Sequence, residues 1–420
     1  MLDKTQEYFL HTMKCVLHPD LSVDSHDTPR GIDEWSAVFR MAAIHFTVPM
    51  VYEVIHKDPS FLSLPPEFTN HWRTGSLSAF IFQTQRTERF LSLYREFLAV
   101  DLHPLVVKGI MCRRLYDKPD TRQSSDEDLL IGKEDFPRLD SFLLSLGYER
   151  KNWEVTDIPF EVSYYHPIEH LYLEVHRSLF PEGKNVYSYL NREFDSVFAD
   201  RLEYLIHDVP VFAMNPTDHF LYLLCHCFKH FLHGGFGIRQ VCDILVTAEK
   251  MGTQIDWARI EDRTKDLHIY TMWLCFFEIG ERYLGFDRKK SGCVRPQESF
   301  PDSEELLLDI LAAGIYGKEG AGRQHSGHMV LSAFGKGRGS AVDMGLLFSS
   351  LYPGKEYLQQ KFHYAKKYRW LLPVACVHRI GKYLLEIRRI SRTTNQDIDS
   401  IRVAEHRIAL LEKYDFAGKR

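Results

Sequence analysis

The sequence has no long apolar run. Its 420 residues are 45% hydrophobic and 26% charged, yet an uninterrupted apolar stretch of about 18 residues, the length that could span a bilayer, occurs nowhere. The first residues, MLDKTQEYFLHTMK, carry acids among their apolar positions and lack the apolar run of a signal peptide. We therefore expect no membrane span and no secretion signal.

Positive charge is also in short supply. The chain has 52 Lys and Arg residues against 57 Asp and Glu, a net charge of -5. General affinity for nucleic acid needs clustered Lys and Arg facing the phosphates, so this balance argues against a nucleic-acid partner. The eight cysteines lack paired CxxC spacing, and a chain of this length does not need disulfides to fold. We expect the reduced cytoplasm as its compartment.

A phosphate-binding loop of the order GxxxxGK[ST] is missing as well. The segments GKEGAGR (317–323) and GKGRGS (335–340) are rich in glycine and basic residues, but they lack that order and a preceding apolar strand. We interpret both as surface loops. Candidate residues for chemistry must therefore come from another pattern.

That pattern lies between Pro104 and Ile131. The segment PLVVKG predicts a short apolar strand, and Gly109 would open a helix that continues to Tyr116. After a loop, DEDLLI predicts a second strand. Side chains alternate between the faces of a strand, so Asp126 and Asp128 should share one face while Leu129 and Ile131 face the core.

A third carboxylate follows on a later strand. In HLYLEVH the apolar residues alternate with Tyr172, Glu174 and His176, so this strand also presents an acid on a polar face. We expect it to pair in antiparallel fashion with the preceding segment IPFEVSYYH. His176 is either a buried hydrogen-bonded histidine or an active-site donor. If Asp126, Asp128 and Glu174 converge, they could hold Mg²⁺, with Mn²⁺ as an alternative, because these hard ions prefer oxygen ligands.

The order of these residues resembles a known superfamily. A Lys108-Gly109 turn, then Arg122, then the run SDEDLL (125–130), then an acid on a later strand is similar to the nucleotidyltransferases of the DNA polymerase beta type. The nearer resemblance is to a poorly characterised bacterial nucleotidyltransferase family, in which a KG turn replaces the usual GS and a helix-rich half follows the core. The likeness extends from about residue 35 to about residue 379. Here Ile110 replaces the usual serine, so a hydroxyl that commonly touches a phosphate is missing from the turn.

The resemblance implies a role for each residue. Asp126 and Asp128 would bind the metal ions, and Glu174 would be the third ligand or the general base. The residues expected to line the nucleotide are Lys108, Gly109, Arg122, Ser125, Lys229, His230 and Arg239. Arg122 could instead form an ion pair with Asp120 or Asp126, and Lys108 could be a surface lysine.

A histidine-rich helix is predicted within NPTDHFLYLLCHCFKHFLHGG. Its histidines at positions 219, 226, 230 and 233 recur at helical spacing, with Lys229 beside them. This face could contact the nucleotide or form a polar seam between two domains. A zinc site from His226 and His230 is the third alternative, but the segment HCFKH lacks the glutamate of HExxH and has no evident third ligand.

The predicted fold class is α+β, with a small mixed-sheet nucleotidyltransferase core embedded in a mostly helical protein. We divide the chain into an N-terminal helical region (1–100), the α/β core (101–185), a helical domain packed on the active site (186–290), and a C-terminal linker and helical region (291–420). The first region is expected to be a helical layer against the core. Helices are expected again from about residue 187.

The predicted function is metal-dependent transfer of a nucleoside monophosphate from a nucleoside triphosphate to an acceptor hydroxyl, with release of pyrophosphate. The acceptor is not readable from the sequence and could be a small molecule, a peptide or a protein. Two rivals remain at this point. One is a nucleotide-binding or regulatory protein that keeps the fold without chemistry, and the other is a metal-dependent phosphohydrolase that uses His226 and His230.

Overall fold

The computed structural model describes the chain in separate ranges, namely residues 1–21, 28–151, 159–182, 187–293, 302–314, 374 and 396–416. The two glycine-rich segments (317–323 and 335–340) lie outside these ranges. No helix within the described ranges is long and apolar enough to cross a membrane.

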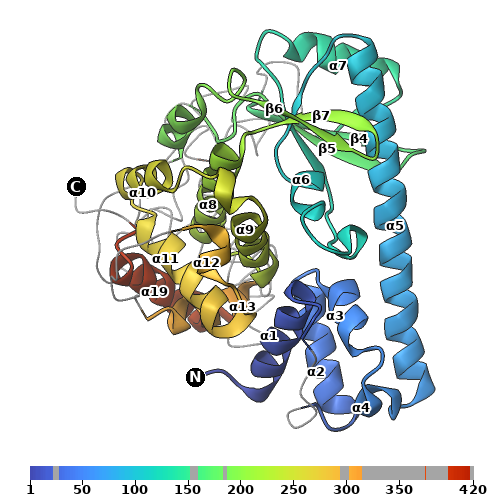
Figure 1. Ribbon diagram of the computed structural model, residues 1–420, viewed down its shortest axis with the longest axis vertical. Coiled ribbons are helices and arrows are strands. Elements are labelled where there is room, and N and C mark those ends of the chain that lie inside the picture. The colour runs from blue at the N-terminus through green and yellow to red at the C-terminus, as the bar shows by residue number, and fades with distance from the viewer. Residues whose placement is uncertain are drawn as a thin grey trace.

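A seven-stranded mixed sheet forms the centre of the fold (Figure 1). Its strands are β1 (Leu105–Val106), β2 (Glu127–Leu130), β3 (Glu149–Arg150), β4 (Glu161–His166), β5 (Leu171–His176), β6 (Leu202–Ile206) and β7 (Val209–Ala213), in the order β3-β4-β5-β2-β1-β7-β6. Strands β2 and β5 pair in parallel, as do β1 and β7, and the remaining pairs are antiparallel. The expected antiparallel pairing of β4 with β5 is confirmed.

One face of the sheet is covered by two helices, α5 (Pro66–Ala99) and α7 (Phe136–Ser145). The odd-numbered apolar residues of β2 and β5 point to this face, where Leu129 and Val175 pack with Phe90, Tyr94 and Leu143. This follows from strand alternation, because residues i and i+2 share a face. The opposite face, which carries the even-numbered residues of β2 and β5, is turned towards the other helices.

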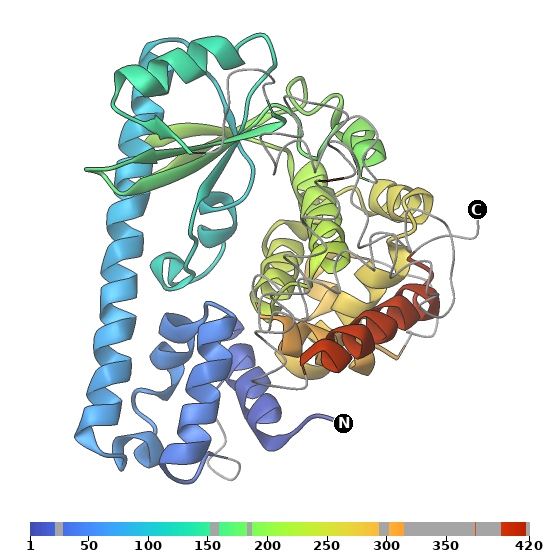
Figure 2. The ribbon, with the colours of Figure 1, turned by 180° about the vertical axis from the view of Figure 1, so that it is seen from behind.

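On that second side lie α6 (Ile110–Arg113), α8 (Pro216–His233) and α9 (Ile238–Met251). Nearly every residue of α8 is buried, because the helix packs on α9 and α10 and lies between these helices and the sheet. Beyond them lie α10 (Trp257–Asp266), α11 (Tyr270–Ile279), η4 (Gly280–Leu284), α12 (Arg288–Ser291), α13 (Glu304–Ala313) and α19 (Gln396–Lys413). Figure 2 shows α19 along the outer surface of this helical layer.

The N-terminal helices form a bundle at the far end of α5. They are α1 (Lys4–Leu17), α2 (Gly31–Ile44), α3 (Val48–Ile55) and α4 (Pro59–Leu62). The bundle is built on aromatic residues, since the ring centroids of Trp35 and Phe61 are 5.1 Å apart and those of Phe61 and Trp72 are 5.4 Å apart. Only the C-terminal half of α5 therefore forms the expected helical layer on the sheet, while α1–α4 pack at a distance from it.

The α+β class and the small mixed sheet inside a mostly helical chain are confirmed. Two local expectations are wrong. Residues 202–213 form the hairpin β6–β7 and not a helix, because pairing of β7 with β1 completes the sheet. The helix after Gly109 ends at Arg113 and does not reach Tyr116. The proposed division into four regions stays a prediction.

Candidate active site

The parallel pairing of β2 and β5 brings two of the predicted acids together. Asp128 lies directly opposite Glu174 in the register, so both side chains point to the face that carries α8. Asp126 is in the bend just before β2 and lines the same cavity. The sheet thus gathers at one place three carboxylates that are separated by up to 48 positions in the sequence.

Asp128 is fully buried and has two cationic or ionisable neighbours. The Nζ atom of Lys108 lies 3.0 Å from its Oδ1 atom, and Nε2 of His176 lies 3.2 Å from the same oxygen. Although burial alone would raise the pKa of Asp128, Lys108 and His176 hold it below the ordinary value, so this carboxylate is charged. The pKa of Lys108 is in turn raised well above its usual value, because burial, which would lower it, is outweighed by the combined attraction of Asp128, Asp126 and Glu174 with Tyr222.

At the other two acids, Glu174 and Asp126, nearby positive charge does not offset the effect of burial on the pKa. Burial, together with the neighbouring charges of Asp128 and Asp126, raises the pKa of Glu174 to about 8. Burial and Asp128 also raise the pKa of Asp126 above its ordinary value. A cation bound among these groups would remove the penalty on their charged forms.

Three residues of this cluster form a group that could hold a metal ion. Asp128, Glu174 and His176 each offer one ligand atom, and the three atoms lie within 4.8 Å of one another. The donor set and its excess of negative charge fit a divalent cation. Asp126 is not in this group, whereas His176 is. His176 is also buried and hydrogen-bonded to Asp128, so its role as an active-site donor stays a prediction.

Gly109 occupies a backbone conformation that its neighbours make necessary. Its φ is +51° and its ψ is -113°, and it is followed by α6, whose first amide, that of Ile110, donates to Glu127 Oε2 at 3.1 Å. A Cβ atom at position 109 would lie 2.1 Å from that same oxygen. Glycine is therefore required in the Lys-Gly turn for two reasons, the positive φ and the close approach of Glu127.

Gly109→Ala is expected to destabilise the protein. The left-handed backbone alone costs about 1–3 kcal/mol in a residue with a Cβ, and the methyl group must also displace Glu127. Gly75→Ala is the matched control, since Gly75 lies inside α5 with no atom within 4 Å of the added methyl group. There the exchange should be neutral or stabilising by about 0.5–1 kcal/mol. Thermal unfolding of both variants is the measurement, and equal transition temperatures would contradict the argument.

A buried ion-pair network lies on the α5 side of β2, across the strand from Asp128. Glu127 Oε1 accepts from Arg113 Nη2 at 2.7 Å and lies 3.7 Å from Nε of Arg86. Arg86 also donates to the carbonyls of Ser124 and Tyr172, at 3.3 and 3.1 Å, so one guanidinium joins the approach to β2 with β5. The network fixes the position of β2, the strand that carries Asp128.

The histidine-rich helix supplies the wall opposite the acids. Lys108 Nζ is 3.1 Å from His226 Nε2, and His230 Nε2 is 3.1 Å from the same nitrogen. Because protonated Lys108 can only donate, His226 Nε2 accepts from it, and Nε2 of His230 lies close to that same nitrogen. Burial and nearby cations lower the pKa values of His226, His230 and Lys229.

Two residues that were predicted to line the nucleotide, Arg122 and Arg239, are hydrogen-bonded to other groups of the protein. The guanidinium of Arg122 donates to Asp243 through Nε at 3.1 Å and through Nη2 at 2.5 Å. Its partner is therefore Asp243 on α9, and not Asp120 or Asp126. Tyr116 donates its hydroxyl to the same carboxylate at 2.8 Å, and Arg239 donates to the carbonyl of Gln123.

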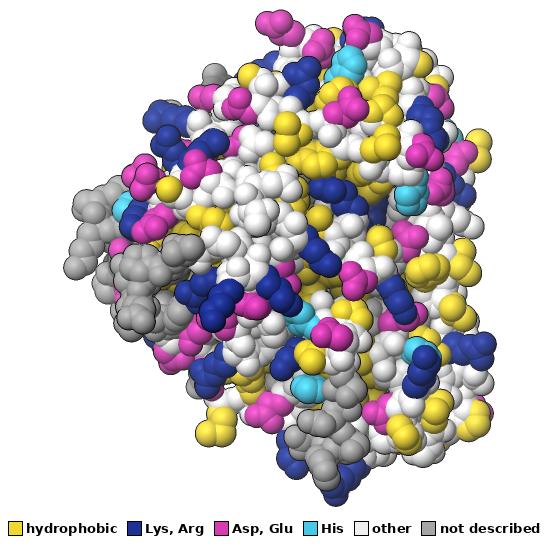
Figure 3. All heavy atoms as spheres, in the orientation of Figure 1, with side chains coloured by type: hydrophobic (Ala, Val, Ile, Leu, Met, Phe, Trp, Pro, Cys, Tyr) yellow, Lys and Arg dark blue, Asp and Glu magenta, His cyan; other side chains and the backbone are white. Residues whose placement is uncertain are grey.

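These side chains enclose one cavity of about 250 Å³ between the sheet and helices α8 and α9. All ten predicted site residues line it, namely Lys108, Gly109, Arg122, Ser125, Asp126, Asp128, Glu174, Lys229, His230 and Arg239. Their individual roles stay predictions. On the face seen in Figure 3, Lys and Arg side chains are interspersed with Asp and Glu.

Sequence reasoning missed three residues of this region. Glu161 lines the cavity and lies 3.5 Å from His176 Nδ1, because the β4–β5 register sets it opposite that histidine. Tyr222 also lines it, one helical turn before His226, a spacing that was visible in the sequence. Glu127 could have been recognised as a buried acid, because alternation gives it the same face as Leu129.

The zinc alternative gains no support. Within the described ranges, the group that could hold a metal ion is Asp128, Glu174 and His176, and neither His226 nor His230 belongs to it. Both histidines instead form a hydrogen-bonded series with Lys108.

Two carboxylates that are neighbours across parallel strands, beside a Lys-Gly turn and a histidine, form a site that could hold a metal ion. The chain belongs to a family described as uncharacterised nucleotidyltransferase, which it matches over residues 33–285. This match contains the whole sheet and every predicted site residue, but it ends before the expected limit near residue 379. No curated protein and no solved structure matches the chain.

Proposed function

We propose that the protein transfers a nucleoside monophosphate from a nucleoside triphosphate to an acceptor hydroxyl, with release of pyrophosphate, and that Mg²⁺ or Mn²⁺ is the metal. The observation that carries the proposal is the pair Asp128 and Glu174 facing each other across β2 and β5, with His176 beside them. Membership of a nucleotidyltransferase family supports it. The fold of the DNA polymerase beta type and a bacterial, cytoplasmic origin belong to the same proposal.

The residues expected to hold the metal are Asp128, Glu174 and His176, with Asp126 at the edge of the group. When bound, a divalent cation supplies electrostatic stabilisation of the phosphate oxygens and a more acidic hydroxyl. The mixed oxygen and nitrogen donor set suits Mn²⁺ better than Mg²⁺, because an imidazole is not a preferred ligand of magnesium.

The protein's own residues account for the remaining steps. A bond forms between the acceptor oxygen and the α-phosphorus while the bond from that phosphorus to the pyrophosphate oxygen breaks. Glu174 is the candidate base for the proton of the acceptor hydroxyl. With a cation bound among the acids, its pKa would fall below the value of about 8, so that the carboxylate is charged near neutral pH. Negative charge moves towards the leaving pyrophosphate, and Lys108 and Lys229 are the cationic side chains lining the cavity that are best placed to stabilise it.

Arg122 has a different assignment from the one its position in the sequence implied. Since Asp243 binds two of its donors, Arg122 shapes the cavity wall more than it binds a phosphate. The net charge of -5 supports an acceptor that is a small molecule, a peptide or a protein in preference to a nucleic acid.

The test is pyrophosphate release from each of the four ribonucleoside triphosphates. Wild-type protein is assayed with Mg²⁺, with Mn²⁺ and with a chelator, in the presence of a crude lysate as the source of acceptor. Release that depends on the metal is the expected result. Metal-dependent nucleotide binding in a thermal-shift assay without release under any of these conditions would instead identify a non-catalytic nucleotide-binding protein.

A further inference from the structure

The two ring nitrogens of His176 lie beside two different carboxylates. Nε2 is 3.2 Å from Oδ1 of Asp128, inside the group that could hold a metal ion, and Nδ1 is 3.5 Å from Oε2 of Glu161. The ring is buried, so its nitrogens depend on these partners. We propose that Glu161 is a positioning residue, which holds His176 so that Nε2 binds the cation. This inference rests on the metal site of the proposed function.

The sheet decides which carboxylate reaches Nδ1. Glu161 is the first residue of β4 and is paired directly with His176 of β5. Two residues that are paired across antiparallel strands project their side chains from the same face. Glu161 also lines the cavity that contains the acids. Backbone pairing therefore places this carboxylate beside the imidazole, and only its side-chain rotation is free.

The chemistry of a metal-binding histidine explains why a carboxylate is needed there. An imidazole binds a metal ion through an unprotonated nitrogen, so a neutral ring that uses Nε2 carries its proton on Nδ1. Among the described residues, Nδ1 of His176 is buried without a hydrogen bond and has Glu161 as its ion-pair partner. The Glu161 side chain is 27% exposed and has room to close the gap. Accepting the Nδ1 proton would fix the ring and make Nε2 a better ligand.

Glu161 also acts on the site through its charge. Beside burial and the two aspartates, it raises the pKa of Glu174. That negative charge would attract a cation even without a hydrogen bond to His176. Glutamine separates the two effects, because its carbonyl oxygen accepts a hydrogen bond while the side chain carries no charge.

The first measurement is Mn²⁺ affinity, by calorimetric titration of the full-length protein without nucleotide. Glu161→Ala should bind Mn²⁺ about 10- to 100-fold more weakly than the wild type, which is the usual cost of removing the partner of a metal-binding histidine. Glu161→Gln should lie closer to the wild type than to Glu161→Ala. Equal losses in both variants would overturn the inference, because Glu161 would then act by charge alone or as a ligand itself.

The pulsed EPR spectrum of bound Mn²⁺ reports on His176 directly. Protein with isotope-labelled histidine should show coupling between Mn²⁺ and a histidine nitrogen, and His176→Gln should abolish that coupling. At saturating Mn²⁺ the coupling should weaken in Glu161→Ala and persist in Glu161→Gln. A spectrum of Glu161→Ala that equals the wild-type spectrum would contradict the positioning role.

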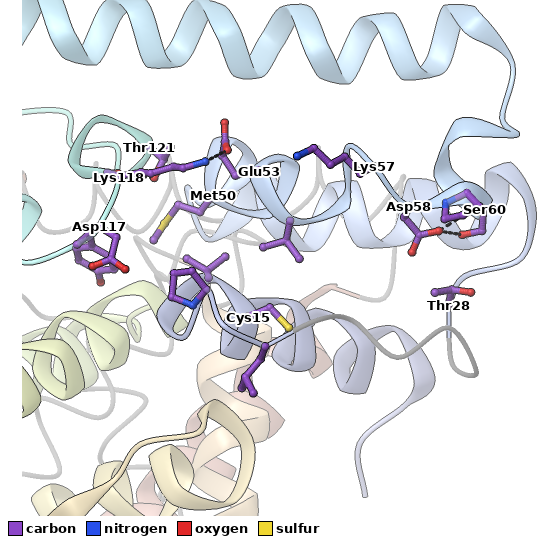
Figure 4. Close-up of a pocket in the computed structure, with 16 residues that line it drawn as sticks. Cys15, Thr28, Met50, Glu53, Lys57, Asp58, Ser60, Asp117, Lys118 and Thr121 are labelled. Carbon is purple, nitrogen blue, oxygen red and sulfur yellow. Dashed lines mark hydrogen bonds and ion pairs between the residues drawn. The ribbon is translucent and has the colours of Figure 1, made fainter. Parts of the chain in front are cut away.

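The matched control is Glu53→Ala. Glu53 lines a larger cavity, of about 800 Å³, where the N-terminal bundle meets the loop after α6, and none of the predicted site residues lines that cavity (Figure 4). Like Glu161, it is a partly exposed glutamate in an ion pair, here with Lys118. Glu53→Ala should keep both the Mn²⁺ affinity and the nitrogen coupling, and thermal unfolding shows that each variant is folded.

The outcomes separate this inference from the proposed function. A wild-type protein that binds no Mn²⁺ would refute the metal site itself, and the role of Glu161 with it. Mn²⁺ binding that is equally tight in the wild type and in Glu161→Ala would refute the role of Glu161 alone.

Discussion

Asp128→Asn is expected to lower the rate of pyrophosphate release by a factor on the order of 10³ or more, which is the effect of removing a central electrostatic group from an active site. Asp128 is the only acid that combines full burial, a place in the metal-ligating group, and contacts with both Lys108 and His176, among the described residues. The amide has nearly the same shape but binds a divalent cation poorly. Release from all four triphosphates should fall together.

The fold should survive this exchange. Asp128 contributes to the raised pKa of Glu174, so removing the charge of Asp128 relieves repulsion among the acids. Lys108 still has His226 and the other acids as neighbours after the exchange. Asp266→Asn, at an exposed position on α10, is the matched control and should react like the wild type. Thermal unfolding and Mn²⁺ titration complete the measurement. Wild-type turnover in folded Asp128→Asn would refute the assignment of the active site.

Glu127→Gln is expected to be the most destabilising exchange near the site, with a loss of about 3–5 kcal/mol in the free energy of unfolding. Glu127 is fully buried, and its carboxylate compensates the charge of two guanidinium groups, those of Arg86 and Arg113. An uncharged amide would leave both cations buried without a counter-charge. The amide of Ile110 would also lose the charged acceptor that fixes the start of α6.

Urea unfolding of Glu127→Gln is measured beside Glu134→Gln, an exposed glutamate of the same region. The exposed exchange should stay within about 0.5 kcal/mol of the wild type. A similarly small effect at position 127 would show that the two arginines are satisfied by their other partners, the carbonyls of Ser124 and Tyr172 and the hydroxyls of Ser124 and Thr87.

The strands that carry the site could be predicted because their signal is local. Alternation in DEDLLI and in HLYLEVH gave the faces of Asp128, Leu129 and Glu174 correctly, since a strand repeats every two residues. The hairpin of residues 202–213 was missed, because its pairing with β1 is a contact across about 100 positions. Such a contact leaves little trace in a short segment.

The partners of charged residues were less accessible to prediction. Arg122 pairs with Asp243, which lies 121 positions further along the chain, and not with a neighbouring acid. Lys108 reaches His226 across 118 positions. Coulombic attraction depends on distance in space, and sequence spacing reports that distance only within one helix or strand.

By itself the sequence determined the α+β class, the Lys-Gly turn, the two acid-bearing strands and the resemblance to nucleotidyltransferases, because each depends on residue type and on periods of two to four residues. The tertiary structure alone decided that β2 and β5 are parallel neighbours, that His176 joins Asp128 and Glu174, and that Arg122 is bound by Asp243. It also decided that Glu161 of β4 lies beside His176. These outcomes depend on how distant segments pack, and packing is fixed by the whole buried surface and not by any one stretch of chain.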